Sequence, residues 1–404
     1  MTDSTSVVES LFHGDPLRIS LCLVAIFLAC PAVLMKVVPK VPVLRKVTFV
    51  PFLFLAPMVL SSLGIIPGSY SLYKPLQSFA LYMAIFFMVL AIDVGRILRS
   101  LDPRVLLLFL LGCLGTGLGA AVAHVVCSPL IGEEPSAMVA ACTAAAYSGG
   151  SMNWAAVSEA IEVPDSLNAT AFPAMVIMYT LYLGALLALE NSPLRPALER
   201  WIGAARPAAA PVAPVADPGG AESAGPPRLE DYIHGFLAFS VVYLASILLE
   251  QLVGGLVFVP QVIFLTTFAI LLGAAAPHTK LAVARRLVRM SAFGEASLYF
   301  LLGIIGAQAT LTESLMHAPV LLLVPTVVIA VHVLVLLPGA RLLRVDLVTG
   351  AIVSIAAIGG AASAPAAAGA LKAAELIPLG VLLGSLGYAL GTYLGVYVGV
   401  LLLP

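Results

Sequence analysis

Two glycine pairs, each inside a long apolar stretch, are the features of this sequence that point most directly to chemistry. They are Gly149-Gly150, within residues 136–163, and Gly359-Gly360, within residues 345–373. A glycine pair interrupts a helix, and the N–H and C=O groups that it frees find no partners in hydrocarbon. Such a break is tolerated where it is buried in protein or lines a wet cavity, so the freed backbone is predicted to face a solute.

Polar side chains surround both pairs, and together they predict one binding site. Opposed helix ends offer partial positive charge to anions and carbonyl oxygens to Na⁺, while hydroxyls and an amide supply directed contacts to a small solute. The predicted substrate or ion ligands are Ser148, Gly149, Gly150, Ser151, Asn153, Gly359, Gly360 and Ser363. The alternative is that the glycines only allow helices to pack closely, which two pairs at matching places make less favoured.

Four further residues are candidates for handling a coupling ion. They are Asp93, Glu159, Glu295 and Gln308. Charge is costly in hydrocarbon, so an ionisable residue at membrane depth indicates a function or a partner. Asp93 also has Arg96 three positions on as an ion-pair partner, and Glu159 also fits a place at the membrane surface.

No catalytic signature is present, so the protein is not expected to be an enzyme. The sequence lacks H-E-x-x-H and G-x-x-x-x-G-K, and its five cysteines show no C-x-x-C spacing. No cofactor or metal is expected beyond Na⁺ or H⁺ as the coupling ion.

The elements that must position these residues are membrane helices. Hydrophobic residues make up 61% of the 404 residues and charged residues 10%, against about 45–50% and 25% in an ordinary soluble domain. Ten apolar stretches are predicted as spans, at about 17–38, 48–66, 75–95, 105–130, 166–190, 232–254, 258–276, 292–311, 318–340 and 377–403. We therefore expect a multi-pass protein of the cell (inner) membrane, in contact with the lipid bilayer. A net charge of −1 gives no indication of nucleic acid as a partner.

The chain divides into two related halves. A tail (1–16) precedes the first half (17–190), and a flexible Pro/Ala/Gly-rich linker (191–230) precedes the second (231–404). Leu81-Tyr82-Met83 and Leu298-Tyr299-Phe300 occupy matching positions, and each half ends in a Gly-Gly segment and a long apolar stretch. If each Gly-Gly segment is a re-entrant hairpin, each half has five spans, the second half is inverted, and nearly all Lys and Arg fall on one side. Broken helices that cross the membrane are the rival arrangement.

Around the glycine pairs the sequence resembles a known family, the domain-of-unknown-function family 819 of YjcL-like membrane proteins. Residues 149–160, GGSMNWAAVSEA, are similar to that family's G-G-S-x-N-[FW]-x-A-V-[AS]-E-A, and residues 356–365 and 378–391 are similar too. Ala361 and Ala362 depart from the pattern, since a proline often stands there. The resemblance implies membership of the cation:proton antiporter and anion transporter superfamily, with a panel domain used for dimerisation and a core domain that moves.

These observations predict an all-α integral membrane protein of two inverted five-span repeats, each with an interrupted helix. The predicted function is secondary active transport of a small solute, coupled to Na⁺ or H⁺, by an elevator-like mechanism in a homodimer. A channel or uniporter using the same glycine tips is the alternative. A membrane sensor without transport is a further one.

Overall fold

The computed structural model describes residues 6–41, 50–92, 94–189, 192–204, 228–254, 258–275, 287, 290–309 and 320–403. Helices are the regular secondary structure of these ranges, and they contain no strand. Seven described helices are long and apolar enough to cross a membrane, which confirms the prediction of an all-helical, multi-pass membrane protein. They are α2 (Pro16–Val37), α4 (Tyr73–Leu90), α6 (Pro103–Ile131), α9 (Asp165–Ala188), α11 (Leu229–Val253), α16 (Leu323–Leu343) and α18 (Ile377–Leu402).

Three of the ten apolar stretches predicted as spans contain helices outside that group of seven. They are α3 (Val50–Ser62), α12 (Gln261–Ala275) and α14 (Ser291–Gln308). α3 and α12 adjoin residues outside the described ranges, and α14 carries Glu295 and Gln308, which lower its mean hydropathy. The other α-helices described are α1 (Val7–Leu11), α5 (Val94–Ser100), α7 (Glu133–Gly149), α8 (Ser151–Ala160), α10 (Arg195–Ile202) and α17 (Leu347–Ala370).

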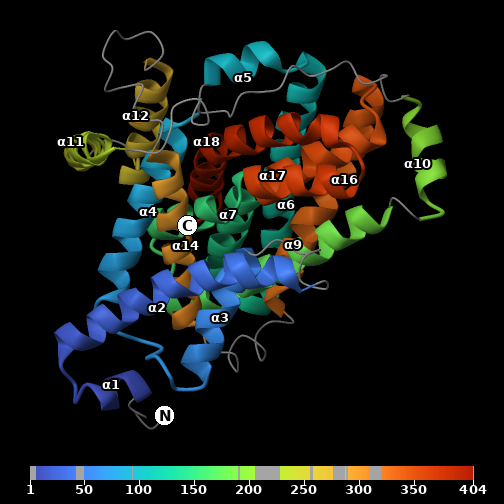
Figure 1. The fold of residues 1–404 in the computed structure, drawn as a ribbon. Helices are drawn as coiled ribbons and strands as arrows, with labels where there is room; N and C mark the ends of the chain where they lie inside the picture. Colours follow the sequence, from blue (N-terminus) through green and yellow to red (C-terminus); the bar gives the residue numbers. More distant parts are fainter. Residues whose placement is uncertain are drawn as a thin grey trace.

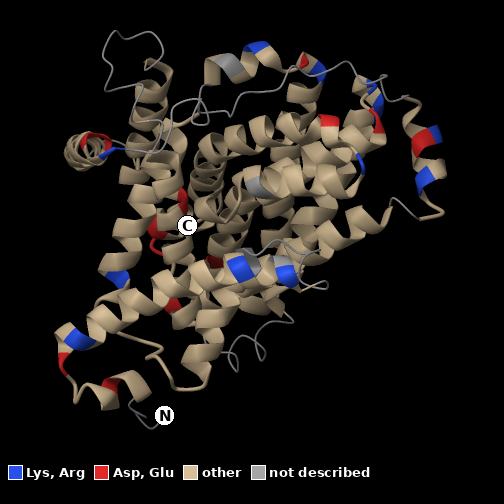
Figure 2. Cartoon of the chain, in the orientation of Figure 1, with Lys and Arg blue, Asp and Glu red and all other residues tan. Residues whose placement is uncertain are grey.

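The outer surface of the long helices is apolar. On α11, the side chains of Leu244, Leu248 and Leu252 are all exposed, that of Leu252 to 76%. Long helical stretches carry no charged residue (Figure 2). Such a surface would drive association in water, whereas the hydrocarbon of a bilayer solvates it.

The helices form two packed groups. In the first group, called the core group here, α6 packs along α16, α18 packs along both α17 and α7, and α8 packs against α7 and α18. In the second, called the panel group here, α14 packs against α4, α3 and α2, and α12 packs against α4 and α11. Figure 1 shows α4, α12 and α14 on one side of the molecule and α6, α16 and α17 on the other.

A row of glycines on α18 allows this helix to lie very close to its neighbours. A Cβ atom on Gly384 would lie 2.3 Å from the backbone nitrogen of Ala361, so no larger residue fits against α17 there. On the same face, a Cβ atom on Gly395 would lie 2.5 Å from Ala145 Cβ and 2.7 Å from Val157 Cγ2. Residues twelve apart in one continuous helix would be separated by about 18 Å. Ala145 and Val157 lie at the same level of α18, so α8 turns back along α7.

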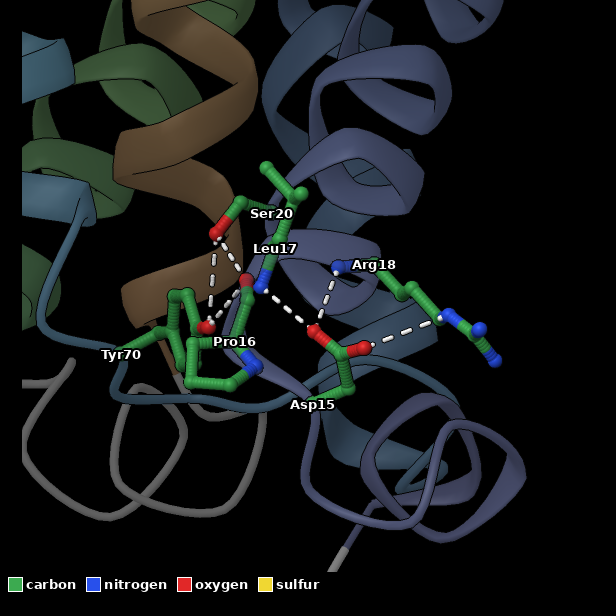
Figure 3. Close-up of polar contacts among 6 residues, drawn as sticks. All are labelled: Asp15, Pro16, Leu17, Arg18, Ser20 and Tyr70. Carbon is green, nitrogen blue, oxygen red and sulfur yellow. Dashed lines mark hydrogen bonds and ion pairs between the residues drawn. The ribbon is translucent and has the colours of Figure 1, made fainter.

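The start of α2 is fixed by capping and by a contact with the loop before α4. Asp15 Oδ1 accepts hydrogen bonds from the backbone N–H groups of Leu17 at 3.0 Å and Arg18 at 3.3 Å (Figure 3). A carboxylate at the N-cap position satisfies backbone donors that have no partner within the helix. The Tyr70 hydroxyl donates to the Pro16 carbonyl oxygen at 3.1 Å and so ties the beginning of α2 to a distant part of the chain.

Short helices lie in the segments predicted as a tail and a linker. In the first, α1 is joined to the loop after α3 because the Val7 N–H donates to the Gly64 carbonyl oxygen at 2.8 Å. In the second, α10 packs on α16, where the Arg341 guanidinium lies 5.0 Å from the centre of the Trp201 ring. Residues 205–227 of the predicted linker lie outside the described residues.

Candidate functional site

The backbone leaves helical geometry at one glycine of each pair. Gly150, between α7 and α8, has φ 87° and ψ 175°, and Gly360, inside α17, has φ 70° and ψ −167°. Positive φ angles of this kind are accessible to glycine at little cost and are strained for other residues. A Cβ atom on Gly150 would lie 3.8 Å from the Cα atom of Gly360. The two irregular positions, one from each half of the sequence, therefore lie next to each other.

A small cavity lies beside these two positions. Its volume is about 70 Å³. Four of the predicted ligands line it, namely Gly150, Ser151, Gly359 and Ser363. The other lining residues are Met88, Met175, Val176, Tyr179, Glu295, Leu298, Tyr299, Ile358 and Tyr388. Residues from α4, α8, α9, α14, α17 and α18 thus meet at one place, and both helix groups contribute to its wall.

Three other predicted ligands, Ser148, Gly149 and Asn153, contact neighbouring helices and do not line the cavity. Ser148 Oγ lies 2.5 Å from Thr116 Oγ1 in a hydrogen bond between α7 and α6. The Asn153 amide is buried against α18, where its Nδ2 donates to the Gly387 carbonyl oxygen at 3.3 Å. A Cβ atom on Gly149 would lie 2.1 Å from that same carbonyl oxygen, so Gly149 permits close contact between helices.

Gly360 lies against the Tyr388 ring and is not itself among the residues that line the cavity. A Cβ atom at Gly360 would lie 3.1 Å from Tyr388 Cε1 and 3.2 Å from the Tyr388 hydroxyl oxygen. A side chain there would displace the Tyr388 ring, which itself forms part of the wall. The glycine is therefore required both for the backbone angle and for the position of Tyr388.

The candidate coupling residues lie in different places. Glu295 lines the cavity, and its Oε1 accepts a hydrogen bond from the hydroxyl of Tyr299 one turn further along α14. Glu159 lies outside the cavity, where its Oε1 accepts a hydrogen bond of 2.7 Å from Ser78 Oγ on α4. Gln308 is at the opposite end of α14 from Glu295, about 20 Å away along the helix axis. Asp93 lies outside the described residues.

Three tyrosines of the cavity wall were missed by the sequence analysis as site residues. Tyr179 lies on α9, Tyr299 on α14 and Tyr388 on α18. The four-residue spacing of Glu295 and Tyr299 on a helix was a signal for the second, and the position of Tyr388 directly after Gly387 in the family-like segment was a signal for the third. Nothing in the local sequence distinguishes Tyr179 from other tyrosines of apolar helices.

The hydroxyl group of Tyr179 has an unusual environment. It is buried beside Ser363, but no hydrogen bond of normal geometry satisfies it. A Cβ atom on Gly359 would lie 2.6 Å from the hydroxyl oxygen, so this group reaches the irregular backbone itself. A buried hydroxyl without a partner costs free energy that a bound ligand or water would recover.

Repeated helices long enough to span a membrane, around a partly polar cavity, define a polytopic membrane protein. Comparison with known proteins gives the family. The chain belongs to the family described as "Protein of unknown function (DUF819)", whose match covers residues 23–404. The chain is also similar to the "Uncharacterized membrane protein YjcL" of Bacillus subtilis (strain 168), with 26% identity over 346 residues, 82% of this chain and 84% of that protein.

Proposed function

We propose that the protein is a secondary active transporter of a small solute, which binds in the cavity between the two glycine pairs. The observation that carries this proposal is the adjacency of Gly150 and Gly360 beside a cavity. Irregular backbone at membrane depth requires protein or solute partners, and discontinuous helices from two halves of a chain are the usual frame of transporter sites. Coupling to Na⁺ or H⁺ is part of the proposal.

Internal symmetry supports two inverted five-span repeats. α6 packs along α16 and α4 along α14, and each pair joins the corresponding helices of the two halves. The final helix of each half, α9 or α18, also packs against the interrupted segment of the other half. α18 passes α7 with Gly387 beside Ser148 and Gly399 beside Ala141. α9 passes α17 in the same antiparallel sense, because Tyr179 lies beside Gly359 while Tyr182 hydrogen bonds Ser354 at 2.7 Å.

The two helix groups suggest how access would alternate. We propose that the core group slides against the panel group in an elevator-like motion. In the described part of the chain, two side-chain hydrogen bonds join the groups, between Ser78 and Glu159 at 2.7 Å and between Thr267 and Tyr393 at 2.8 Å. Packing within each group is extensive, whereas α4 and α12 meet α8 and α18 over short stretches. A homodimer formed through the panel group, in the cell (inner) membrane, completes the proposal.

Transport by reconstituted protein tests the proposal. Purified protein in proteoliposomes should accumulate a solute saturably when an inward Na⁺ or H⁺ gradient is imposed, and the accumulation should stop when the gradient is dissipated. A panel of radiolabelled amino acids, carboxylates and amines identifies the solute. Unitary currents would indicate a channel instead, and flux that is insensitive to both gradients would contradict coupled transport.

A matched pair of glycine variants links transport to the site. Gly150→Ala places a side chain at a φ of 87°, next to the cavity, and is expected to abolish uptake. Gly184→Ala is the control, because a Cβ atom there would meet nothing within 4 Å. Size-exclusion profiles of both variants show whether loss of uptake has been caused by unfolding. Equal uptake by the two variants would separate transport from the glycine breaks.

A further inference from the structure

We propose that this cavity binds a partly dehydrated monovalent alkali cation, with the carboxylate of Glu295 as its charged ligand. The cation site rests on the proposed function only for its role in coupling, since binding itself needs no transport. Four observations support it: the sign of the charge at the cavity, the kind of atoms that line it, a buried hydroxyl without a hydrogen bond, and its size.

The charge at the cavity is negative. At each glycine break the carbonyl end of one helix stands beside the N–H end of the next, so the partial charges of the helix ends largely offset each other. The hydroxyl of Tyr388 also lies near the backbone of Ala361, at the N-terminal end of the second part of α17. Among the lining residues that the structure describes, Glu295 is charged and no Lys or Arg occurs. This balance favours a cation over an anion.

The polar side chains of the described lining residues all carry oxygen atoms. Besides the Glu295 carboxylate, the wall presents hydroxyl groups, which belong to Ser151, Tyr179, Tyr299, Ser363 and Tyr388. The carbonyl oxygen of Gly359 lies 4.0 Å from the place of a Cβ atom on Gly150 and so belongs to the same surroundings. Hard cations prefer such oxygen ligands, and carbonyls of interrupted helices are known partners of Na⁺.

One of these oxygens lacks a partner. The hydroxyl of Tyr179 is buried and unsatisfied at the glycine break, while Glu295 is held by Tyr299 and remains exposed at the mouth of the cavity. The exposed carboxylate and the buried Tyr179 hydroxyl belong to residues that line the same cavity, so both are available to an ion bound there. Binding would give that hydroxyl an electrostatic partner and remove the cost of its desolvation.

The cavity size agrees with a small ion. A volume of about 70 Å³ accommodates a monovalent cation with a few water molecules. An organic solute of many atoms needs a wider cavity, which the sliding of the core group would have to provide. In this conformation the site is therefore suited to the coupling ion.

Cation binding to the purified full-length protein tests the inference. The probes are NaCl, LiCl and KCl against choline chloride at constant ionic strength, with thermal unfolding and scintillation-proximity binding of ²²Na⁺ as readouts. We expect saturable stabilisation of the wild type by an alkali cation. Glu295→Gln should weaken the apparent affinity by roughly tenfold or more, because it removes the charged ligand. Tyr299→Phe, which keeps the carboxylate, should weaken it by a smaller factor and serves if Glu295→Gln fails to fold.

Two controls carry the same chemical changes elsewhere. Glu134→Gln removes an exposed carboxylate at the start of α7, and Tyr397→Phe removes a hydroxyl from the outer surface of α18. Both should bind the cation as the wild type does. Unchanged affinity of both cavity variants, or stabilisation by no alkali cation above choline, overturns the inference. Glu295-dependent binding without any solute flux would instead contradict the transporter proposal and still support the cation site.

Discussion

Thr392 on α18 donates a hydrogen bond of 2.7 Å from its Oγ1 to Oδ1 of Asn153 on α8, and both residues are fully buried. The Nδ2 atom of the same amide donates to the carbonyl oxygen of Gly387. Both ends of one side chain are thus bound to one helix. This relationship fixes α8, and with it the Gly150 backbone, against α18.

Removal of the amide should destabilise the protein. Asn153→Ala leaves Thr392 and the Gly387 carbonyl without their partner in a buried place, and we expect a loss of about 1–3 kcal/mol in the free energy of unfolding. Thr392→Val removes one of the two bonds and should cost less. Reversible unfolding in mixed micelles measures both. Thr326→Val is the control, since that exposed hydroxyl bonds to its own helix; a control effect as large as that of Asn153→Ala would contradict the assignment.

The glycine row of α18 should tolerate no side chain. Gly384→Ala would place a Cβ atom 2.3 Å from the Ala361 nitrogen, and overpacking of this kind costs about 1–3 kcal/mol or more. Gly184→Ala, in an open part of α9, should instead stabilise its helix by up to about 1 kcal/mol. The two alanine variants are expected to shift the unfolding midpoint in opposite directions, and a shift in the same direction would show that close packing of α18 is not required.

Loss of the Tyr179 hydroxyl should affect stability and ligand binding in opposite ways. Because this hydroxyl is buried without a hydrogen bond, Tyr179→Phe should leave the free energy of unfolding unchanged or raise it by about 1 kcal/mol. The same variant should bind the cation or solute more weakly. Thermal unfolding with and without added NaCl measures both effects. A large loss of stability in the absence of ligand would show that the hydroxyl has a structural partner.

The hydrogen bond between Ser78 and Glu159 should influence the rate of transport more than stability. It joins α4 of the panel group to α8 of the core group at a half-buried place, so Ser78→Ala is expected to cost less than about 1 kcal/mol. If the groups slide, loss of this bond should change the maximal uptake rate while the half-saturating solute concentration changes little. Ser297→Ala, whose hydroxyl bonds within its own helix, is the matched control. An equal effect of both variants on uptake would contradict a role of the contact between the groups.

The sequence was sufficient to predict the class of the fold, because hydrocarbon requires long apolar helices and these are visible as runs of residues. Segments such as 105–130 and 377–403 therefore became α6 and α18 with small changes at their ends. Within the described residues, α3 ends at Ser62, before the predicted end of its span, and α12 begins at Gln261, after the predicted start. Apolar residues next to a helix look the same in sequence whether or not they are helical. The inverted repeats and the elevator motion stay predictions.

The candidate site could be predicted only in part. Gly150, Ser151, Gly359, Ser363 and Glu295 do line one cavity. Successive residues on a helix point about 100° apart, so neighbours in sequence face different surroundings. Ser148 and Asn153 turned toward α6 and α18 for that reason, and the directions depend on which helices pack there. Tyr179 reached the cavity through the arrangement of α9, which no local pattern encodes.

One helix is in contact with both glycine breaks. Gly384 touches Ala361 after the second break, Gly387 touches Ser148 before the first, and Tyr388 stands beside them. The distance between the two glycine breaks is therefore set by less than one turn of α18, because three residues of a helix rise by about 4.5 Å. If the cavity binds a cation, the geometry of that turn sets the spacing of the ligands from the two breaks, and with it the order of preference among Li⁺, Na⁺ and K⁺.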